Sequence, residues 1–360
     1  MIKKLDIYII KKFLGTFFFM IGAFMLIAVV FDISENIDEL LKSEAPWYSI
    51  ITDYYFNFCF YFGTLLSSFI IFLTIIWFTS KLAQQSEIIA ILCGGVSYAR
   101  IIRPYFIAAG ILVSLMLLLS HIIVPRANRV KYEFEVQYLK GALTVAEQNM
   151  HREISPGVIA YFSSFRPESN SGSDFSLEKW NNGKLTYKLI SSGATIHPET
   201  QIWTIEKVQI RTFHDDGTES LILKDKLDTL LNISDRVFAL RAEVAGAMTW
   251  TELNQFIDDQ KLGGSGRVAQ FELEKYNRTA SPFSIFVLTL IGVSIASRKQ
   301  RGGIGLHLLF AVIIGFTFVF INRITQVSAM SLGLSAALAV WIPNILFSLV
   351  GLWLYSRAQK

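Results

Sequence analysis

The sequence predicts a membrane protein with six transmembrane α-helices and an extracytoplasmic antiparallel β domain, of sandwich or jelly-roll type. Three observations predict this class. The 360 residues are 52% hydrophobic and 17% charged, with a mean hydropathy of +0.44, which is too apolar for a soluble chain of this length. Six apolar runs, five of them of bilayer length and one shorter, fall into two groups of three. The polar stretch between the groups alternates polar and apolar residues, as β-strands do.

Five apolar segments are long enough to cross the hydrocarbon core of a bilayer as helices. They are residues 13–33, 56–78, 101–124, 304–324 and 334–355. A sixth segment, residues 279–296, is shorter, but Pro282 suits a first helical turn and no charge follows it within the segment. We count it as a span, because the charges at both of its ends require an even total number of spans.

Positive residues set the orientation of the spans. They precede the first span, separate the second from the third, follow the fourth and end the chain: Lys3, Lys4, Lys11, Lys12, Lys81, Arg100, Arg103, Arg298, Lys299, Arg301, Arg357 and Lys360. If six spans alternate, all these residues fall on one side, and the positive-inside rule makes that side the cytoplasm. We therefore expect both termini in the cytoplasm. The loop after the first span is acidic and is expected outside, as is the polar insert.

The polar insert carries two hairpin signals. Asn182-Gly183 separates two alternating segments, and Asp215-Asp216-Gly217 separates the next two. This pattern predicts antiparallel strands, and their number suggests a sandwich or jelly roll. After the strands, Thr249 and Glu252 have the spacing of a capping box. A short amphipathic helix is therefore predicted to return the chain to the membrane, followed by a flexible glycine-rich link at residues 263–266.

Several function classes are disfavoured. No Gly-x-x-x-x-Gly-Lys-Ser/Thr loop is present, so this chain does not hydrolyse a nucleotide by that route. Cys59 and Cys93 offer neither a disulfide framework nor a four-ligand metal site. The net charge of +4 is too small to indicate a nucleic-acid partner. The centres of the spans lack Asp and Glu, which disfavours ion-coupled transport. No cofactor is predicted, and the energy for any transport is expected from a partner.

Four blocks of sequence carry a resemblance to a known family. The segment QQSEIIAILCGG at residues 84–95 resembles the cytoplasmic coupling helix of the LptF/LptG permease family. The block EKYNRTASPF at residues 274–283 is similar to the Glu-x-x-x-Lys-x-x-x-Pro pattern before the fourth span of that family, with Arg278 at the Lys position. WIPN at residues 341–344 and the amphipathic opening at residues 5–14 also fit. Cys93 departs from the small polar residue common at its position.

The resemblance implies a transport subunit of the bacterial inner membrane. Such a permease pairs with a homologous permease on a cytoplasmic ATPase dimer, takes lipopolysaccharide from the outer leaflet and passes it to a periplasmic bridge protein. The β domain, a jelly roll in the family, lies in the periplasm. The expected domains are residues 1–124 with a coupling helix at about 80–95, residues 125–278 with the β domain, and residues 279–360. The sequence leaves open whether the chain is F-like or G-like, and the absence of a tail domain favours G.

The resemblance also suggests three sets of site residues. The ATPase-coupling set is Glu87, Ile88, Ile91, Leu92, Gly94 and Gly95. Here Glu87 would present a carboxylate to the ATPase, and the alternative is a solvated loop charge. The hinge set is Glu274, Arg278 and Pro282, where the β domain would meet the fourth span. Its alternative is an arginine that anchors a helix end at the membrane surface.

A third set concerns lipid. Arg323, beside Asn322, is expected at the outer interface, where its guanidinium suits a lipid phosphate. Positive residues are unusual on that side, which favours a functional explanation. The alternatives are a simple membrane anchor, or a pairing of Arg323 with Asp32 and Glu35 that closes a gate when no lipid is bound.

Two other function classes stay open. A mechanical exporter that drives periplasmic partners is one, although such proteins usually carry their outer domain after the first span rather than the third. A membrane-anchored sensor or scaffold whose β domain binds a ligand is the other. Topology discriminates the first class from a permease. A helix shaped to dock an ATPase would be superfluous in the second class, so co-purification of an ATPase would decide.

Overall fold

The computed structural model describes residues 3–139, 147–166, 169–197, 200, 202–214, 216–231, 242–262, 268–297 and 303–358. The chain divides into two compact units. The helical unit comprises Met1–Leu139, Gly246–Trp250 and Ala269–Lys360, and the β unit comprises Lys140–Ala245 and Thr251–Val268. The predicted fold class, six membrane helices with an antiparallel β domain, is confirmed.

Among the described residues, six helices are long and apolar enough to cross a membrane. They are built around α1 (Lys4–Lys42), α3 (Phe56–Gln84), α5 (Tyr98–Leu118), α9 (Val268–Ala296), α10 (Gly303–Ser331) and α11 (Ala336–Arg357). Shorter helical segments are α2 (Trp47–Ser49), η1 (Ile50–Tyr55), α4 (Glu87–Cys93), η2 (Leu119–Ile123), α6 (Val124–Phe134), η3 (Glu135–Leu139) and α7 (Ala242–Ala247). The η segments are single π-helical turns that continue a neighbouring α-helix.

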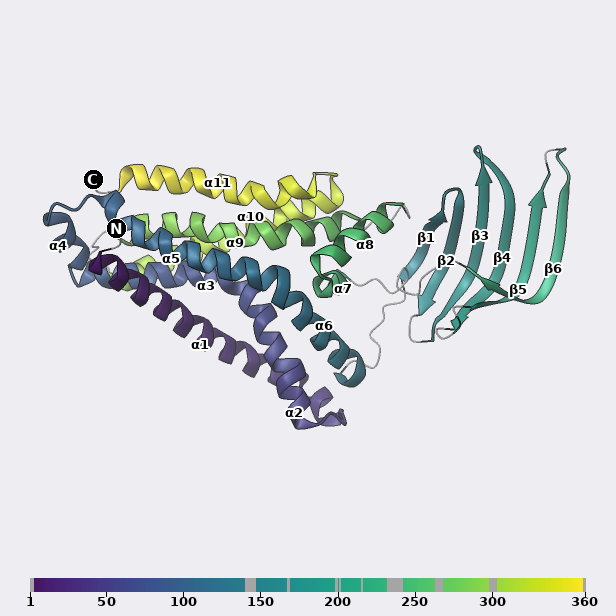
Figure 1. Ribbon diagram of the computed structural model, residues 1–360, viewed down its shortest axis with the longest axis horizontal. Coiled ribbons are helices and arrows are strands. Elements are labelled where there is room, and N and C mark those ends of the chain that lie inside the picture. Colours follow the sequence, from purple (N-terminus) through teal and green to yellow (C-terminus); the bar gives the residue numbers. More distant parts are fainter. Residues whose placement is uncertain are drawn as a thin grey trace. The chain divides into compact units, whose positions relative to one another are not determined.

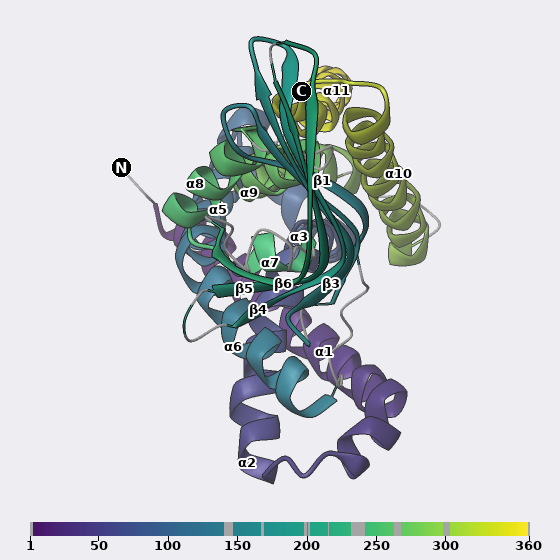
Figure 2. The same ribbon diagram turned by 90° about the vertical axis from the view of Figure 1, so that its right-hand side faces the viewer.

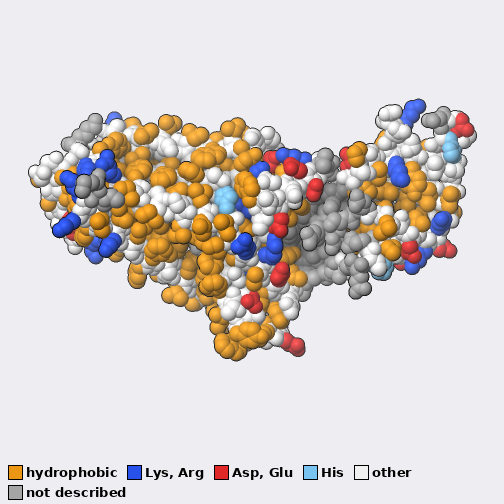
Figure 3. Space-filling model, in the orientation of Figure 1, with side chains coloured by type: hydrophobic (Ala, Val, Ile, Leu, Met, Phe, Trp, Pro, Cys, Tyr) orange, Lys and Arg blue, Asp and Glu red, His pale blue; other side chains and the backbone are white. Residues whose placement is uncertain are grey.

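The two chain ends lie at the same end of the helical unit, together with α4 (Figure 1). We call this the near end and the opposite one the far end. This arrangement is what six alternating spans require. Hydrophobic side chains cover much of the helical unit on the face shown, and Lys and Arg side chains gather at the near end (Figure 3). The helices therefore present to the membrane the apolar residues that identified them.

Several helices extend beyond the apolar runs that predicted them. Helix α9 begins at Val268, well before residue 279, and α1 continues to Lys42, past residue 33. The polar extension of α9 is rich in good helix formers, and Glu274 and Arg278 pair across one turn within it. The positively charged cluster at residues 298–301 lies outside the described residues.

The β unit contains one six-stranded antiparallel sheet whose strands follow the chain order. The strands are β1 (Glu147–Ser155), β2 (Val158–Arg166), β3 (Ser171–Asn181), β4 (Lys184–His197), β5 (Ile202–Phe213) and β6 (Glu219–Leu230). They bend along their length (Figure 2). Within the described strands the sheet is a single up-and-down layer, and one of its faces buries an aromatic cluster that includes Phe162, Phe175 and Trp203.

The first predicted hairpin is confirmed. Asn181 pairs with Lys184, and the two residues between them have positive φ angles, 49° at Asn182 and 78° at Gly183. A two-residue turn needs this conformation to match the twist of the strands. The second hairpin joins β5 to β6 as expected, although Asp215 itself lies outside the described residues.

The predicted return helix is also confirmed as α8 (Trp250–Leu262). Leu253 and Ile257 are buried, which agrees with the predicted apolar face. The glycine-rich link after it lies outside the part of the chain that the structure describes.

Candidate functional site

Helix α4 is a short helix at the near end, directly after α3 (Figure 1). Ser86, with a φ of 59°, turns the chain out of α3, and Gly95, with a φ of 80°, lets it leave α4 after Gly94. A glycine adopts such a left-handed conformation without strain. A separate helix does lie between two spans, but it covers Glu87–Cys93 rather than about 80–95, because α3 continues to Gln84. Two sharp turns set its direction.

The apolar stripe of α4 faces the protein's own core. Ile88 is 2% exposed and belongs to the main core of the helical unit, against which Ile91 and Leu92 also pack. These residues fix α4 to the bundle, so they would act on a partner only through the position of the helix. The residues that point outward are Ile89, which is 39% exposed, with Ala90 and Cys93. Sequence reasoning missed this face, although helical spacing from the stripe identifies it.

Glu87 connects α4 to α1. Its carboxylate accepts a hydrogen bond of 3.3 Å from the Tyr8 hydroxyl, which in turn accepts one of 2.6 Å from the Lys12 ammonium. The Glu87 side chain is partly exposed. The Glu87 carboxylate therefore contacts Tyr8 within the chain and is also accessible to a partner protein.

The first turn of α1 is fixed to α5 by a bidentate ion pair. Arg100 donates to both carboxylate oxygens of Asp6, at 2.8 and 2.6 Å, and Asp6 is 3% exposed. Asp6 also accepts a 2.7 Å hydrogen bond from the backbone N–H of Lys3, which begins the helix. Paired hydrogen bonds of this kind hold a defined geometry. Sequence reasoning missed this pair, whose signal is a lone carboxylate within the basic opening.

Arg278 lies in α9 toward the far end and is 6% exposed. Its Nε donates to Glu274 at 3.1 Å, and its Nη1 donates to the Met248 carbonyl oxygen at 2.8 Å. Asn128 of α6 donates to the carbonyl of Gly246 at 3.1 Å. The end of α7 and the segment between α7 and α8 are thus held by Asn128 of α6 and Arg278 of α9. The structure brings the predicted hinge residues Glu274 and Arg278 together, and Pro282 lies buried one turn farther along α9.

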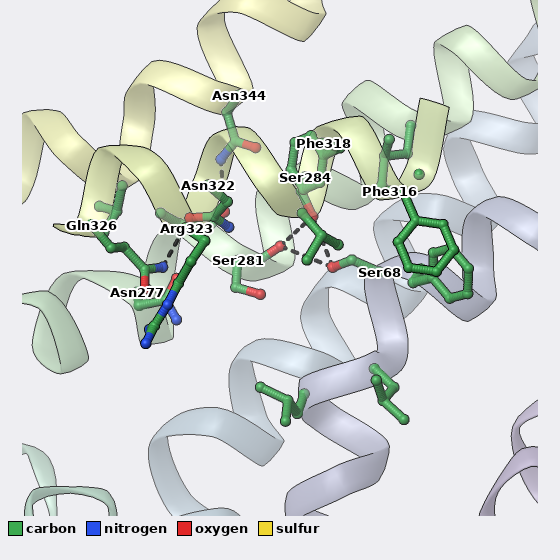
Figure 4. Close-up of a pocket in the computed structure, with 18 residues that line it drawn as sticks. Ser68, Asn277, Ser281, Ser284, Phe316, Phe318, Asn322, Arg323, Gln326 and Asn344 are labelled. Atoms are coloured by element: carbon green, nitrogen blue, oxygen red, sulfur yellow. Dashed lines mark hydrogen bonds between the residues drawn. The ribbon is translucent and has the colours of Figure 1, made fainter. Parts of the chain in front are cut away.

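A cavity of about 530 Å³ lies between α3, α9, α10 and α11 (Figure 4). One side is polar, with Asn277 of α9 and the α10 residues Asn322, Arg323 and Gln326. Gln326 donates a 2.9 Å hydrogen bond to Asn322. The Arg323 side chain is exposed and forms no hydrogen bond or ion pair with any described residue. A free guanidinium beside a set of amides can bind an anionic group.

The rest of the cavity is mainly apolar. Residues of four helices line it, among them Leu65, Phe69, Leu288, Phe316, Val319 and Val340. Asn344 of α11 is buried and donates to the Ala280 carbonyl at 2.9 Å, while its side-chain oxygen has no partner among the described residues. The cavity is therefore amphipathic, as a site for one end of a lipid would be.

The structure separates the two groups of predicted lipid residues. Arg323 and Asn322 border the cavity, but Asp32 and Glu35 of α1 do not. Asp32 instead accepts a 3.3 Å hydrogen bond from the Tyr54 hydroxyl. Among the residues for which coordinates are described, no three His, Cys, Asp or Glu side chains are grouped so as to hold a metal ion.

Residues 7–357 match the family model described as lipopolysaccharide export system permease LptF/LptG. The chain belongs to this family. The LptG permease protein of Escherichia coli O6:H1 is 20% identical over 280 residues, which cover 77% of each chain. The LptG protein of Haemophilus influenzae is 25% identical over 166 residues, or 44% of each chain. The predicted family is thus confirmed, and this LptF/LptG permease is a multi-pass inner-membrane transport protein rather than an enzyme.

Proposed function

We propose that this permease is one subunit of an ATP-driven exporter that extracts lipopolysaccharide from the outer leaflet of the inner membrane and passes it to a periplasmic bridge protein. It pairs with a homologous permease, and a separate cytoplasmic ATPase dimer hydrolyses the ATP. The observation that carries the proposal is α4, a helix with one face fixed in the core and the other exposed at the near end.

This form of α4 suits a coupling element. Ile88 ties the helix to the bundle, so a force on the exposed face moves α3 and α5 with it. Glu87 adds α1 through Tyr8. An ATPase groove with positive charge would attract the partly exposed carboxylate, and the apolar Ile89 would add buried area on docking.

The cavity beside Arg323 suits the binding of the exported lipid. A guanidinium without a protein partner can donate paired hydrogen bonds to a phosphate. Arg323 follows the start of α10 at Gly303 by about 20 residues, or about 30 Å of helix, which supports a position at the level of the outer headgroups. The apolar lining accepts acyl chain, so one cavity serves both parts of an anionic lipid.

Affinity purification in mild detergent tests the docking part. The wild-type chain should bring down an ATPase, a second permease and lipopolysaccharide, and Glu87→Ala should lose the ATPase while the spans stay folded. Glu39→Ala, an exposed carboxylate on α1 away from the near end, is the matched control. Wild-type ATPase yield and transport in Glu87→Ala would contradict the role of Glu87.

Photocrosslinking tests the lipid part. A crosslinker at position 323 should label lipopolysaccharide in the resting complex, and one at the exposed Phe320 should label bulk phospholipid instead. Arg323→Glu should reduce export more than Arg323→Lys, because lysine keeps the attraction to phosphate. Labelling of phospholipid alone at position 323, with normal export in both variants, would leave Arg323 as a membrane anchor.

A further inference from the structure

A buried hydrogen bond joins the start of α10 to the end of α3. His307 is 2% exposed, and its Nδ1 lies 2.8 Å from the hydroxyl of Ser80, which is also buried. Over the described residues 303–331, it is the one side-chain hydrogen bond between α10 and another described helix. Both side chains are buried, so breaking the bond leaves two polar groups unsatisfied.

The remainder of α10 is held to α3 by apolar packing. At Gly315 an added Cβ would lie 2.7 Å from the Phe69 ring, so the two helices approach closely there. Packing of this kind resists separation but allows small sliding or rotation, whereas a hydrogen bond fixes one geometry. His307 and Ser80 therefore set the rotation of α10 about its own axis.

The far half of α10 is placed differently. There the cavity lies between α9 and α10, and its lining includes Arg323 and Asn322 (Figure 4). The helix is thus fixed by a directional bond near one end and borders open space near the other. A rotation of α10 about the fixed point changes the shape of the cavity and the direction in which Arg323 points.

Ser80 is also next to the coupling helix. It lies in the last turns of α3, which ends at Gln84, and α4 begins at Glu87. Ile88 of α4 packs in the same core cluster as Leu82 and Ala83 of α3. A displacement of α4 therefore reaches Ser80 through a short rigid stretch of helix.

We infer that Ser80 and His307 are positioning residues for transport, and that their hydrogen bond is the pivot through which movement of α4 reaches α10 and the lipid cavity. The inference rests on the proposed function, because it assumes that force enters at α4. The pair is buried and does not line the cavity, so it acts through the geometry of α10 alone.

The test compares two equally buried hydrogen bonds on neighbouring residues of α3. Ser80→Ala removes the bond to α10, and Tyr105→Phe removes the 3.2 Å bond that Thr79 donates to Tyr105 of α5. In the reconstituted complex with purified lipopolysaccharide, Ser80→Ala should lower the lipid released per ATP hydrolysed by at least about fivefold, the lower end of typical coupling between sites. ATPase rate and complex yield should not change. Tyr105→Phe should keep the wild-type ratio of lipid released to ATP hydrolysed. Ser80→Thr retains a hydroxyl, so this variant should also show the wild-type ratio.

A second measurement needs only this chain. Spin labels at Ile51 and Leu332, both exposed near the far ends of α3 and α10, report the distance between the helices. Ser80→Ala should broaden or shift that distance distribution, and Tyr105→Phe should not. The pivot is overturned if Ser80→Ala leaves both the ratio and the distances unchanged, or if both variants lose coupling equally. Absence of any ATPase from the complex would instead contradict the proposed function, and the spin-label result would still decide whether the bond fixes α10.

Discussion

At Gly292, α9 packs closely against α3, and the replacement of this glycine by alanine is a sharp test of the packing. The Cβ of alanine would lie 2.9 Å from Ile75 Cγ2 and 3.4 Å from Ile76 Cγ1. Both isoleucines are fully buried. The Cγ2 methyl is bonded directly to Cβ, and a β-branched residue in a helix has one strongly preferred χ1 rotamer, so the methyl cannot swing away cheaply.

The expected magnitude follows from two opposing terms. An extra methyl group in a tightly packed core typically costs about 1–3 kcal/mol. Alanine favours the helix over glycine by about 1 kcal/mol. Because the contact is well inside normal van der Waals distance, the packing cost should win, and Gly292→Ala should lower the free energy of unfolding by about 1 kcal/mol.

The control is Gly22→Ala in α1, where an added Cβ meets nothing within 4 Å. There only the helix propensity remains, so this variant should be stabilised or unchanged. Unfolding by SDS in mixed micelles, followed by circular dichroism, measures both. Equal stabilisation of Gly292→Ala and Gly22→Ala would contradict the close packing of α9 against α3.

Three further predictions concern α4, α9 and the β unit. Ile88→Asn should detach α4, because burial of the side chain is lost, at a cost of about 2 kcal/mol or more, and an amide enters the core; hydrogen exchange should rise in α4 but not in α3. Arg278→Lys retains the charge but loses the guanidinium bonds, so exchange at residues 246–250 should accelerate, whereas a simple membrane anchor would tolerate lysine. In the β unit, the hydrogen bond from Lys188 lowers the pKa of Glu178 below its ordinary value of 4.5. The ionised Glu178 carboxylate therefore stabilises the folded β unit fully above about pH 4.5, and this stabilisation is lost as the pH falls through the lower pKa of the folded state. Glu178→Gln removes the carboxylate, so the free energy of unfolding of the β unit should depend less on acid pH.

The spans were predictable because the membrane imposes one simple requirement on the sequence. A segment that crosses the bilayer must be apolar over its whole length, whatever it packs against. The ends of the helices were not predictable in the same way. The extension of α9 back to Val268 depends on polar helix formers and on the contact between Arg278 and the Met248 carbonyl, which only the folded chain provides.

The candidate sites also include features that a local sequence pattern predicts and features that depend on the folded chain. The existence of α4 was visible in a local pattern, namely an apolar stripe followed by Gly94 and Gly95. The pattern could not show whether the stripe packs on the chain's own bundle or on a partner, because that depends on the core around Ile88. The cavity brings together residues as distant in sequence as Ser68, Asn277 and Asn344. No spacing rule connects them, and Arg323 was found only because its charge is unusual at that depth.

The order of strands in the β unit has a consequence for how the protein is made. Each strand pairs with the one synthesised just before it, from β1 to β6. Contacts between neighbours in sequence close short loops and form quickly, without waiting for distant parts of the chain. The sheet can therefore assemble hairpin by hairpin, before α9, α10 and α11 have been translated. The strand pairing needs no residue of these three helices, so the β unit can be complete while they are still being made.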